Sequence, residues 1–163
     1  MTPAIDVLKG QVTVRRARPG DVPSIAALVG AWAAEEVLLP RTADELALAV
    51  DDYVVAVDGR GRVLACGALR EYSPSLAELV SLAVAREAHG RGLGRLLVAQ
   101  VERLATQRGY TSLFAHTLEP AFFGAVGYER VDRALYPEKQ ARAHTECFWR
   151  ALAGHDDGLA VAA

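Results

Sequence analysis

The sequence predicts one mixed α/β (α+β) domain, and three observations support this fold class. Short apolar runs with strand periodicity alternate with segments of helical periodicity along the chain. The length of 163 residues is enough for one domain with a sizeable core. No internal repeat or linker divides it. We therefore expect a mixed central sheet of six to seven strands with about four helices over residues 1–153, followed by a disordered tail over residues 154–163.

The chain is expected to begin with a strand and a helix. Val12 and Val14 alternate within a strand over Val12–Ala17. Pro19-Gly20 forms a turn, and Asp21 is placed to cap the helix that follows, with proline in its first turn. The apolar stripe of this helix consists of Ile25, Leu28, Val29 and Trp32.

A second helix and a hairpin come next. Thr42-Ala-Asp-Glu45 has the form of a capping box, which indicates a helix through about Val50. Strands over Tyr53–Val57 and Val63–Leu69 flank a loop rich in turn residues, Asp58-Gly-Arg-Gly61. Ser73-Pro74 then breaks the chain.

The second half contains the strongest strand and the strongest helix. Leu76–Val84 is apolar on both faces, which is typical of a central strand. Gly92–Arg108 has one continuous apolar side, and Gly109 ends it. A strand over Ser112–His116 and a short helix over Pro120–Val126 come next. Two weaker patterns predict strands over Tyr128–Val131 and Cys147–Leu152.

Composition excludes several classes of function. The net charge of −2 offers no basic excess for nucleic acid or a membrane surface. Cys66 and Cys147 are isolated thiols that suggest neither a disulfide framework nor a metal cluster, and the histidines have no metal-ligand spacing. The sequence shows neither a leader nor an apolar stretch of membrane-spanning length. We expect a cytoplasmic protein that uses no metal.

The segment between the central strand and the long helix predicts an anion site. It reads His89-Gly-Arg-Gly-Leu-Gly94, and its glycines let backbone N–H groups approach a phosphate at a helix start. A nucleoside triphosphate is disfavoured because Arg95-Leu96 replaces the Lys-Ser/Thr of a Walker loop. A dinucleotide is disfavoured because three other strands precede the strand that leads into the loop.

The order of elements, with this loop and with Ala121-Phe-Phe-Gly-Ala-Val-Gly-Tyr128, resembles the GNAT acetyltransferase superfamily. His89 stands where the family pattern has Gln or Arg, whereas Gly92 and Gly94 match it. The resemblance runs from about Val12 to Leu152. It implies acetyl-CoA as donor and a primary amine as acceptor.

Four segments also resemble the catalytic domain of bacterial N-acetylglutamate synthases. They are Leu38-Leu-Pro-Arg-Thr42, Cys66-Gly-Ala-Leu69, Ala77-Glu-Leu-Val-Ser-Leu-Ala-Val84 and Phe114-Ala-His-Thr-Leu-Glu-Pro-Ala-Phe-Phe123. This resemblance implies L-glutamate as acceptor and a place in arginine biosynthesis, although the chain from Tyr136 onward matches poorly. Another small amine, a protein amine, and a non-catalytic acetyl-CoA-binding module remain as alternatives. A homodimer also stays open.

The resemblance assigns the donor to backbone groups of the central strand and to the glycine loop. A backbone N–H near Val84 would polarise the thioester carbonyl, and the acceptor amine would attack it directly. Phe122 and Phe123 would line the donor chain or belong to the core, the latter more readily for Phe122. The expected donor-binding residues are Leu82, Ala83, Val84, His89, Gly90, Arg91, Gly92, Leu93, Gly94, Arg95, Phe122 and Phe123.

Glu78 is the expected general base, because the attacking nitrogen must lose a proton and family members often keep a carboxylate near this position. Glu71 is the reserve candidate. Arg41 would hold a carboxylate of the acceptor through two parallel hydrogen bonds. Arg70 and Thr117 are further candidates for acceptor binding. The tyrosine that many family members carry at the second aromatic position is replaced by Phe123.

Overall fold

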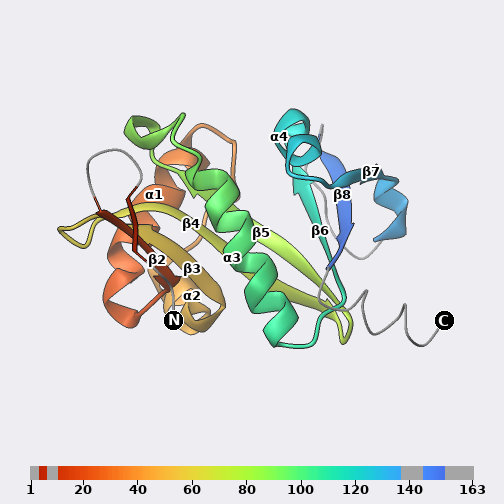
Figure 1. Cartoon of the computed structure of the whole chain (residues 1–163), viewed down its shortest axis with the longest axis horizontal. Helices are drawn as coiled ribbons and strands as arrows, with labels where there is room; N and C mark the ends of the chain where they lie inside the picture. Colours follow the sequence, from red (N-terminus) through yellow and green to blue (C-terminus); the bar gives the residue numbers. More distant parts are fainter. Residues whose placement is uncertain (1–3, 7–10, 137–144, 153–163) are drawn as a thin grey trace. The chain divides into compact units, whose positions relative to one another are not determined.

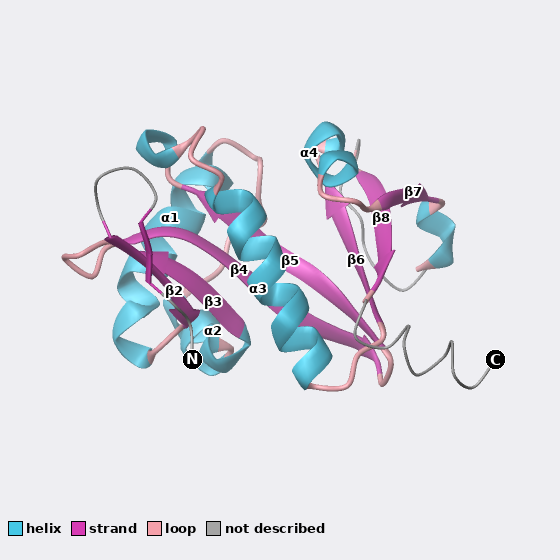
Figure 2. Cartoon of the chain, viewed as in Figure 1, coloured by secondary structure: helices cyan, strands magenta, loops and turns pink. Residues whose placement is uncertain are grey.

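The computed structural model describes residues 4–6, 11–136 and 145–152 (Figure 1). Within these residues, eight strands follow the hydrogen-bonded order β1-β2-β3-β4-β5-β6-β8-β7 (Figure 2). The strands are β1 (Ala4–Asp6), β2 (Gln11–Arg16), β3 (Tyr53–Val57), β4 (Val63–Ser73), β5 (Leu76–Val84), β6 (Ser112–Thr117), β7 (Glu129–Val131) and β8 (Glu146–Ala151). The α-helices are α1 (Val22–Ala34), α2 (Ala43–Leu48), α3 (Leu93–Gln107) and α4 (Pro120–Ala125).

The predicted fold class is confirmed, with three corrections in detail. The described part of the chain contains one strand more than the six to seven expected, because β1 pairs with β2. Strand β4 continues to Ser73 instead of ending at Leu69. Short 3₁₀ turns, among them η3 (Arg86–Ala88) and η4 (Arg133–Leu135), were not predicted. The expected tail over residues 154–163 lies outside the described residues. No helix in the described ranges is both long and apolar enough to span a bilayer.

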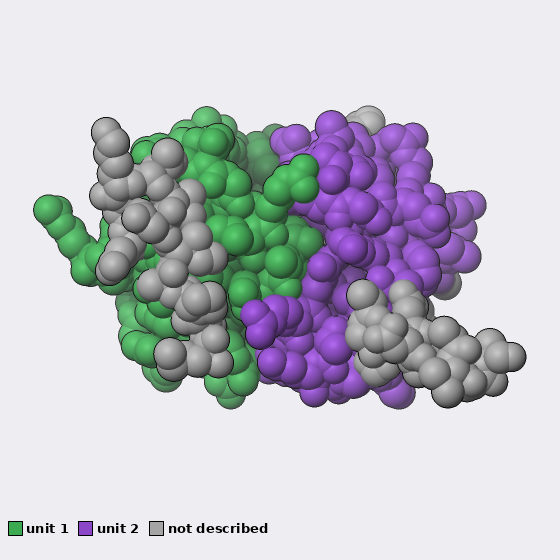
Figure 3. All heavy atoms as spheres, viewed as in Figure 1, with its two compact units in different colours: residues 1–69, 81–101 green, residues 70–80, 102–163 purple. Residues whose placement is uncertain are grey.

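The chain divides into two compact units, which Figure 3 shows in different colours. The first unit contains residues 1–69 and 81–101, and the second contains residues 70–80 and 102–163. The boundaries fall inside β4, β5 and α3, so these three elements are continuous along the chain from one unit into the other.

The first unit contains an antiparallel meander and the first two helices. β1, β2, β3 and β4 pair in succession, with Val14 opposite Ala56 and Val55 opposite Cys66. Every residue of β3 is buried. The predicted capping box of α2 is present, since Glu45 N donates to Thr42 Oγ1 and Thr42 N donates to Glu45 Oε1, both at 3.1 Å.

Close packing of α3 on the sheet of the first unit depends on a glycine. A Cβ at Gly67 of β4 would lie 3.2 Å from Val101 Cγ2 of α3 and 3.4 Å from Leu82 Cδ1 of β5. The contact with Val101 is tighter than ordinary packing, so a side chain at position 67 would require Val101 to shift by a few tenths of an ångström. The glycine thus sets how near the long helix approaches β4.

Asp21 stands at the N-cap position of α1, but its carboxylate does not cap the helix as predicted. It instead accepts two hydrogen bonds from Arg15, at 2.7 and 3.1 Å, and one from the Arg18 N–H at 2.7 Å. Burial opposes ionisation of Asp21, yet these hydrogen bonds outweigh it and hold the pKa of the carboxyl below its ordinary value. The charged pair thus joins β2 to the start of α1.

Asp21→Asn is expected to destabilise the fold by about 2–4 kcal/mol at neutral pH, because it leaves a half-buried guanidinium without its bidentate partner. Since the folded pKa is depressed, the stabilisation by Asp21 is complete above its unfolded pKa and is lost as pH falls through the folded one. Urea denaturation of both proteins should give stabilities that differ most near pH 7 and converge toward pH 2. Equal stabilities at neutral pH would contradict the assignment.

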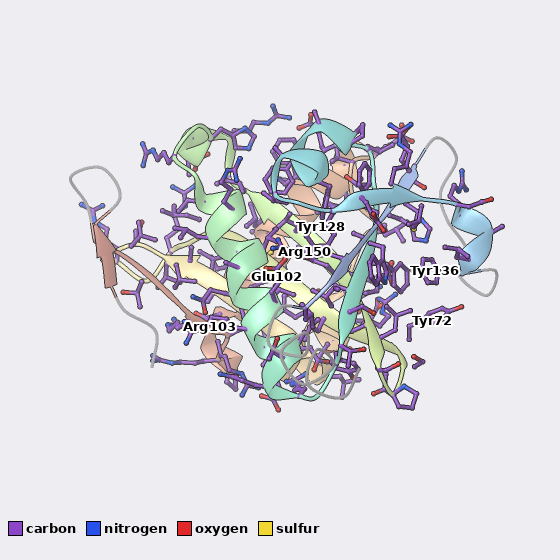
Figure 4. The ribbon with its side chains drawn as sticks, turned by 45° about the vertical axis from the view of Figure 1, so that its right-hand side comes forward. Tyr72, Glu102, Arg103, Tyr128, Tyr136 and Arg150 are labelled. Carbon is purple, nitrogen blue, oxygen red and sulfur yellow. The ribbon has the colours of Figure 1, made fainter. Side chains whose placement is uncertain are left out.

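The second unit contains parallel pairing on one side and antiparallel pairing on the other. β5 and β6 run parallel, with Glu78 opposite Phe114, and β8 pairs antiparallel with both β6 and β7. Phe114, Tyr136 and Cys147 form a buried cluster, against which Tyr72 and Trp149 pack. Figure 4 shows Tyr72 and Tyr136 side by side, and their ring centroids are 5.5 Å apart.

A polar network holds the end of α4 against α3 and β8 in the second unit. The Tyr128 hydroxyl donates to Glu102 Oε2 at 2.8 Å, and Arg150 lies 3.4 Å from the same oxygen (Figure 4). Arg150 also donates to the Val126 carbonyl at 2.8 Å. Burial, followed by the nearby Glu102 charge, raises the pKa of Tyr128 far above its ordinary value. Tyr128 is therefore a neutral hydrogen-bond donor at physiological pH.

Candidate active site

The glycine loop adopts the conformation that an anion site requires. Gly90 and Gly92 both have φ of 77°, in the left-handed region that favours glycine, and a Cβ at either position would meet no atom within 4 Å. The exposed loop leads directly into α3, whose first N–H groups have no acceptor within the helix, although that of Leu96 donates to the Gly92 carbonyl at 3.2 Å. Arg91 and Arg95 are exposed beside them. A helix start with exposed arginines is suited to an anion, and the pyrophosphate assigned to it stays a prediction.

The peptide that joins β5 to this loop is fixed at both ends. The Val84 carbonyl accepts hydrogen bonds from Trp32 Nε1 at 3.0 Å and from His89 Nε2 at 2.9 Å. The following N–H, of Ala85, donates to the Leu64 carbonyl at 2.8 Å. A carbonyl oxygen has two lone pairs, so that of Val84 is saturated within the protein. This refines the expectation that Val84 serves the donor, because its carbonyl is already occupied by two donors of the protein.

A kink interrupts β5 between its two halves. Ser81 has φ of 54°, a left-handed value that is uncommon for a residue other than glycine. Its hydroxyl accepts a hydrogen bond from Tyr53 at 3.1 Å, and its carbonyl accepts the thiol of Cys66 at 3.3 Å. Burial raises the pKa of Cys66 to about 12. The kink is thus held by side chains from β3 and β4, and Leu82 and Ala83 follow it.

Glu78 lies on β5 within the second unit and is only 4% exposed. Its neighbour Cys147 is also buried, and the carboxylate charge of Glu78 adds to burial in raising the pKa of that thiol to about 11. Arg133, of η4, opposes this shift. A carboxylate can accept a proton from a substrate amine, so Glu78 stays the predicted base.

Glu71 lies in a different setting from Glu78, although both belong to the second unit. It is exposed on the extension of β4, and its Oε1 accepts the Tyr110 hydroxyl at 2.7 Å. This contact connects β4 to the segment after α3. Glu71 therefore takes part in a hydrogen bond within the second unit, and it stays the reserve candidate for the base.

The predicted acceptor residues occur in both units. Arg41 is half-buried in the first unit, one residue before the N-cap of α2. Arg70 and Thr117 belong to the second unit, where Arg70 is exposed and Thr117 is buried. The Thr117 hydroxyl accepts the Glu119 N–H at 2.8 Å and so shapes the entry to α4.

The two aromatic residues of α4 have the reverse of the expected burial. Phe123 is 4% exposed and packs edge-on to Phe122 and Tyr128 and beside Phe148. Phe122 is half-buried. Phe123 is therefore the core residue, and Phe122 is the aromatic with a free surface.

Two side chains of the site were missed in the sequence. Trp32 was interpreted only as part of an apolar stripe, yet its indole N–H reaches the end of β5. Tyr53 was interpreted only as a strand residue, yet it bonds the kink. An indole or a phenol that is otherwise buried normally needs a polar partner, which was the one available signal.

The mixed sheet and the glycine loop at a helix start agree with the acetyltransferase class that the sequence resembles. A sequence model described as the acetyltransferase (GNAT) family matches residues 26–131. The chain belongs to this family.

Relatives with sequence similarity over most of the chain agree with this assignment. An uncharacterized N-acetyltransferase of Chlorobaculum tepidum is 35% identical over 82% of this chain and 86% of its own. An amino-acid acetyltransferase of Mycobacterium tuberculosis is 34% identical over 73% of this chain and 69% of its own.

Solved structures show the same fold. An N-acetylglutamate synthase from Neisseria gonorrhoeae, complexed with coenzyme A and N-acetyl-glutamate, superposes with a TM-score of 0.79 at 24% identity. It covers 86% of this chain and 35% of that one. A Mycobacterium tuberculosis protein complexed with CoA has a TM-score of 0.77 at 26% identity, covering 85% of this chain and 98% of that one. The protein is an acetyl-CoA-dependent N-acetyltransferase.

Proposed function

We propose that the protein transfers an acetyl group to the amine of an amino acid, with L-glutamate as the acceptor, and that it serves arginine biosynthesis in the cytoplasm. The observation that carries this proposal is the 34% identity to an amino-acid acetyltransferase over 73% of the chain. The half-buried Arg41 supports it, since a guanidinium fork matches a carboxylate.

The glycine loop has the task of holding the donor. Its N–H groups, the first turn of α3, and Arg91 and Arg95 bind the pyrophosphate, while the part of β5 after Ser81 offers backbone groups to the amides of the donor chain. An N–H at the end of β5 stabilises the oxyanion that forms on the thioester carbonyl. Phe122 provides an apolar wall.

Glu78 has the task of accepting a proton from the acceptor. The neutral amine that results forms a bond with the carbonyl carbon. As the carbon–sulfur bond breaks, the nitrogen releases its second proton to water. The sulfur leaves as a thiolate and takes a proton from water, because Phe123 has no hydroxyl to give. A thiol with a pKa of about 8.5 needs little help to leave.

A panel of acceptors tests the proposal. Release of the CoA thiol should be fastest with L-glutamate and much slower with L-glutamine or γ-aminobutyrate, which each lack one carboxylate. Transfer to another amine at a higher kcat/KM would contradict glutamate as acceptor. Absence of transfer to every acceptor, with CoA bound, would favour a binding module.

Arg41→Ala should raise the KM for glutamate about 10–100-fold, because a charge-assisted hydrogen bond contributes about 1.5–3 kcal/mol. The KM for acetyl-CoA should not change. The two single-carboxylate analogues identify which carboxylate Arg41 binds. Arg41→Ala should not change the KM for the analogue that lacks this carboxylate. A surface arginine such as Arg60, which is exposed in the hairpin between β3 and β4, gives the matched control. An unchanged KM for glutamate would remove Arg41 from the acceptor site.

A further inference from the structure

We propose that Trp32 and His89 are positioning residues for acetyl-CoA, acting together through the Val84 carbonyl. The inference rests on the proposed donor site at the glycine loop. Both side chains donate to the same oxygen, at 3.0 and 2.9 Å, at the point where β5 ends and the loop begins.

Three hydrogen bonds determine the orientation of one peptide plane. Its carbonyl end is held by Trp32 and His89, and its N–H end is held by the Leu64 carbonyl. The plane cannot turn about its neighbouring dihedral angles without breaking bonds at both ends. The chain that follows therefore enters η3 and the glycine loop in one direction. Donor binding then requires less ordering of the loop, which raises affinity without any new contact to the ligand.

Trp32 is itself held in place by the end of α1. The Val37 N–H donates to the Trp32 carbonyl and the Glu36 N–H donates to that of Ala33, both at 3.0 Å, which is the hydrogen-bond pattern of a Schellman motif. Glu36 takes φ of 62° to complete it. The indole thus projects from a closed helix end toward β5.

The indole ring also contacts two side chains from the segment that follows β5. The His89 ring stacks on it with an angle of 2° between planes and 5.5 Å between centroids. The Arg86 guanidinium lies 4.5 Å from the ring centroid and forms an ion pair with Glu35. The Trp32 ring therefore fixes the His89 ring as well as the carbonyl that both residues bond.

The chemistry of the contact explains why histidine can stand at position 89. A carbonyl oxygen only accepts, so Nε2 of His89 must carry its proton. Both the neutral Nε2–H tautomer and the cation supply that donor. A glutamine amide can donate in the same way, whereas leucine cannot.

The test measures donor and acceptor constants for matched variants. Trp32→Phe keeps an aromatic ring and removes the N–H, and it should raise the Kd and KM for acetyl-CoA about three- to tenfold while kcat and the acceptor KM stay the same. His89→Leu should act similarly, and His89→Gln should restore the wild-type value. In the double variant the Kd for acetyl-CoA should rise by more than the product of the two single effects, because either donor alone still holds the Val84 carbonyl.

Trp149→Phe is the control, since Trp149 is the other tryptophan of the chain and lies on β8. It should leave the Kd for CoA unchanged, and in that background the fluorescence of Trp32 should change on addition of CoA. A wild-type Kd for acetyl-CoA in Trp32→Phe would overturn the inference. So would a lowered Tm together with a lower kcat and similar increases in the KM values of both substrates. A wild-type protein that fails to bind CoA would instead overturn the proposed function.

Discussion

Glu78→Gln is expected to lower kcat about 10²–10⁴-fold, which is the usual contribution of a general base. Some activity should remain, because positioning of the amine against the thioester is independent of the base and contributes about 7–11 kcal/mol to lowering the barrier. The substitution keeps the size of the side chain in a site that is 4% exposed. Steady-state kinetics should show nearly unchanged KM values.

The pH dependence separates catalysis from structure. Without the base only the free amine already present in solution can react, so the loss of rate in Glu78→Gln should be large at neutral pH and should shrink as the pH approaches the pKa of the acceptor amine. Glu71→Gln is the control, because Glu71 is also a strand acid but binds the Tyr110 hydroxyl. It should retain most of the activity. A pH profile that is identical in wild type and Glu78→Gln would exclude Glu78 as the base.

Gly92→Ala is expected to weaken donor binding about 10–100-fold. At φ of 77° an alanine strains the backbone by roughly 1–2 kcal/mol, so the loop relaxes and turns its N–H groups away from the phosphates. The protein itself offers no obstacle to the added methyl group, since no atom lies within 4 Å of it. A higher Kd for CoA, measured by calorimetric titration, would therefore come from altered contacts between the loop and CoA and not from a clash within the protein.

Gly61→Ala is the matched control for this loss. Gly61 lies in the hairpin between β3 and β4, has φ of 81°, and has the same empty surroundings. Both substitutions should lower the free energy of unfolding by a similar amount, but only that in the loop should raise the Kd for CoA. Equal Kd values for CoA in Gly92→Ala and Gly61→Ala would contradict the binding of the pyrophosphate at the glycine loop.

The elements with strong local patterns were predictable from the sequence. The range of β5 is as predicted, and α3 differs from the prediction by one residue at each end, because a long apolar run and a continuous apolar stripe are unambiguous. The extension of β4 was missed because Arg70 and Glu71 are exposed and polar, and only pairing reveals the strand. β1 has three residues, too few for a pattern.

The residues expected to bind the donor were easier to predict than the residues that hold those segments in place. Glycines that need positive φ and a helix start are visible in a sequence, whereas the bond from Trp32 to Val84 joins residues 52 positions apart. The sequence around Ser81 does not indicate its left-handed backbone conformation, because serine rarely adopts a positive φ. The exchange of burial between Phe122 and Phe123 depends on a one-residue rotation of a six-residue helix, which periodicity cannot resolve at that length.

The burial of both cysteines has a practical consequence for measuring the enzyme. Cys66 and Cys147 are the two thiols of the chain, and both are buried with pKa values raised to about 12 and about 11. Only a thiolate attacks a chromogenic disulfide reagent, and burial keeps both thiols protonated at pH 8 and away from the reagent. The folded protein should thus give almost no colour of its own, so that continuous readings follow CoA alone. A slow rise in colour without substrate would then report unfolding.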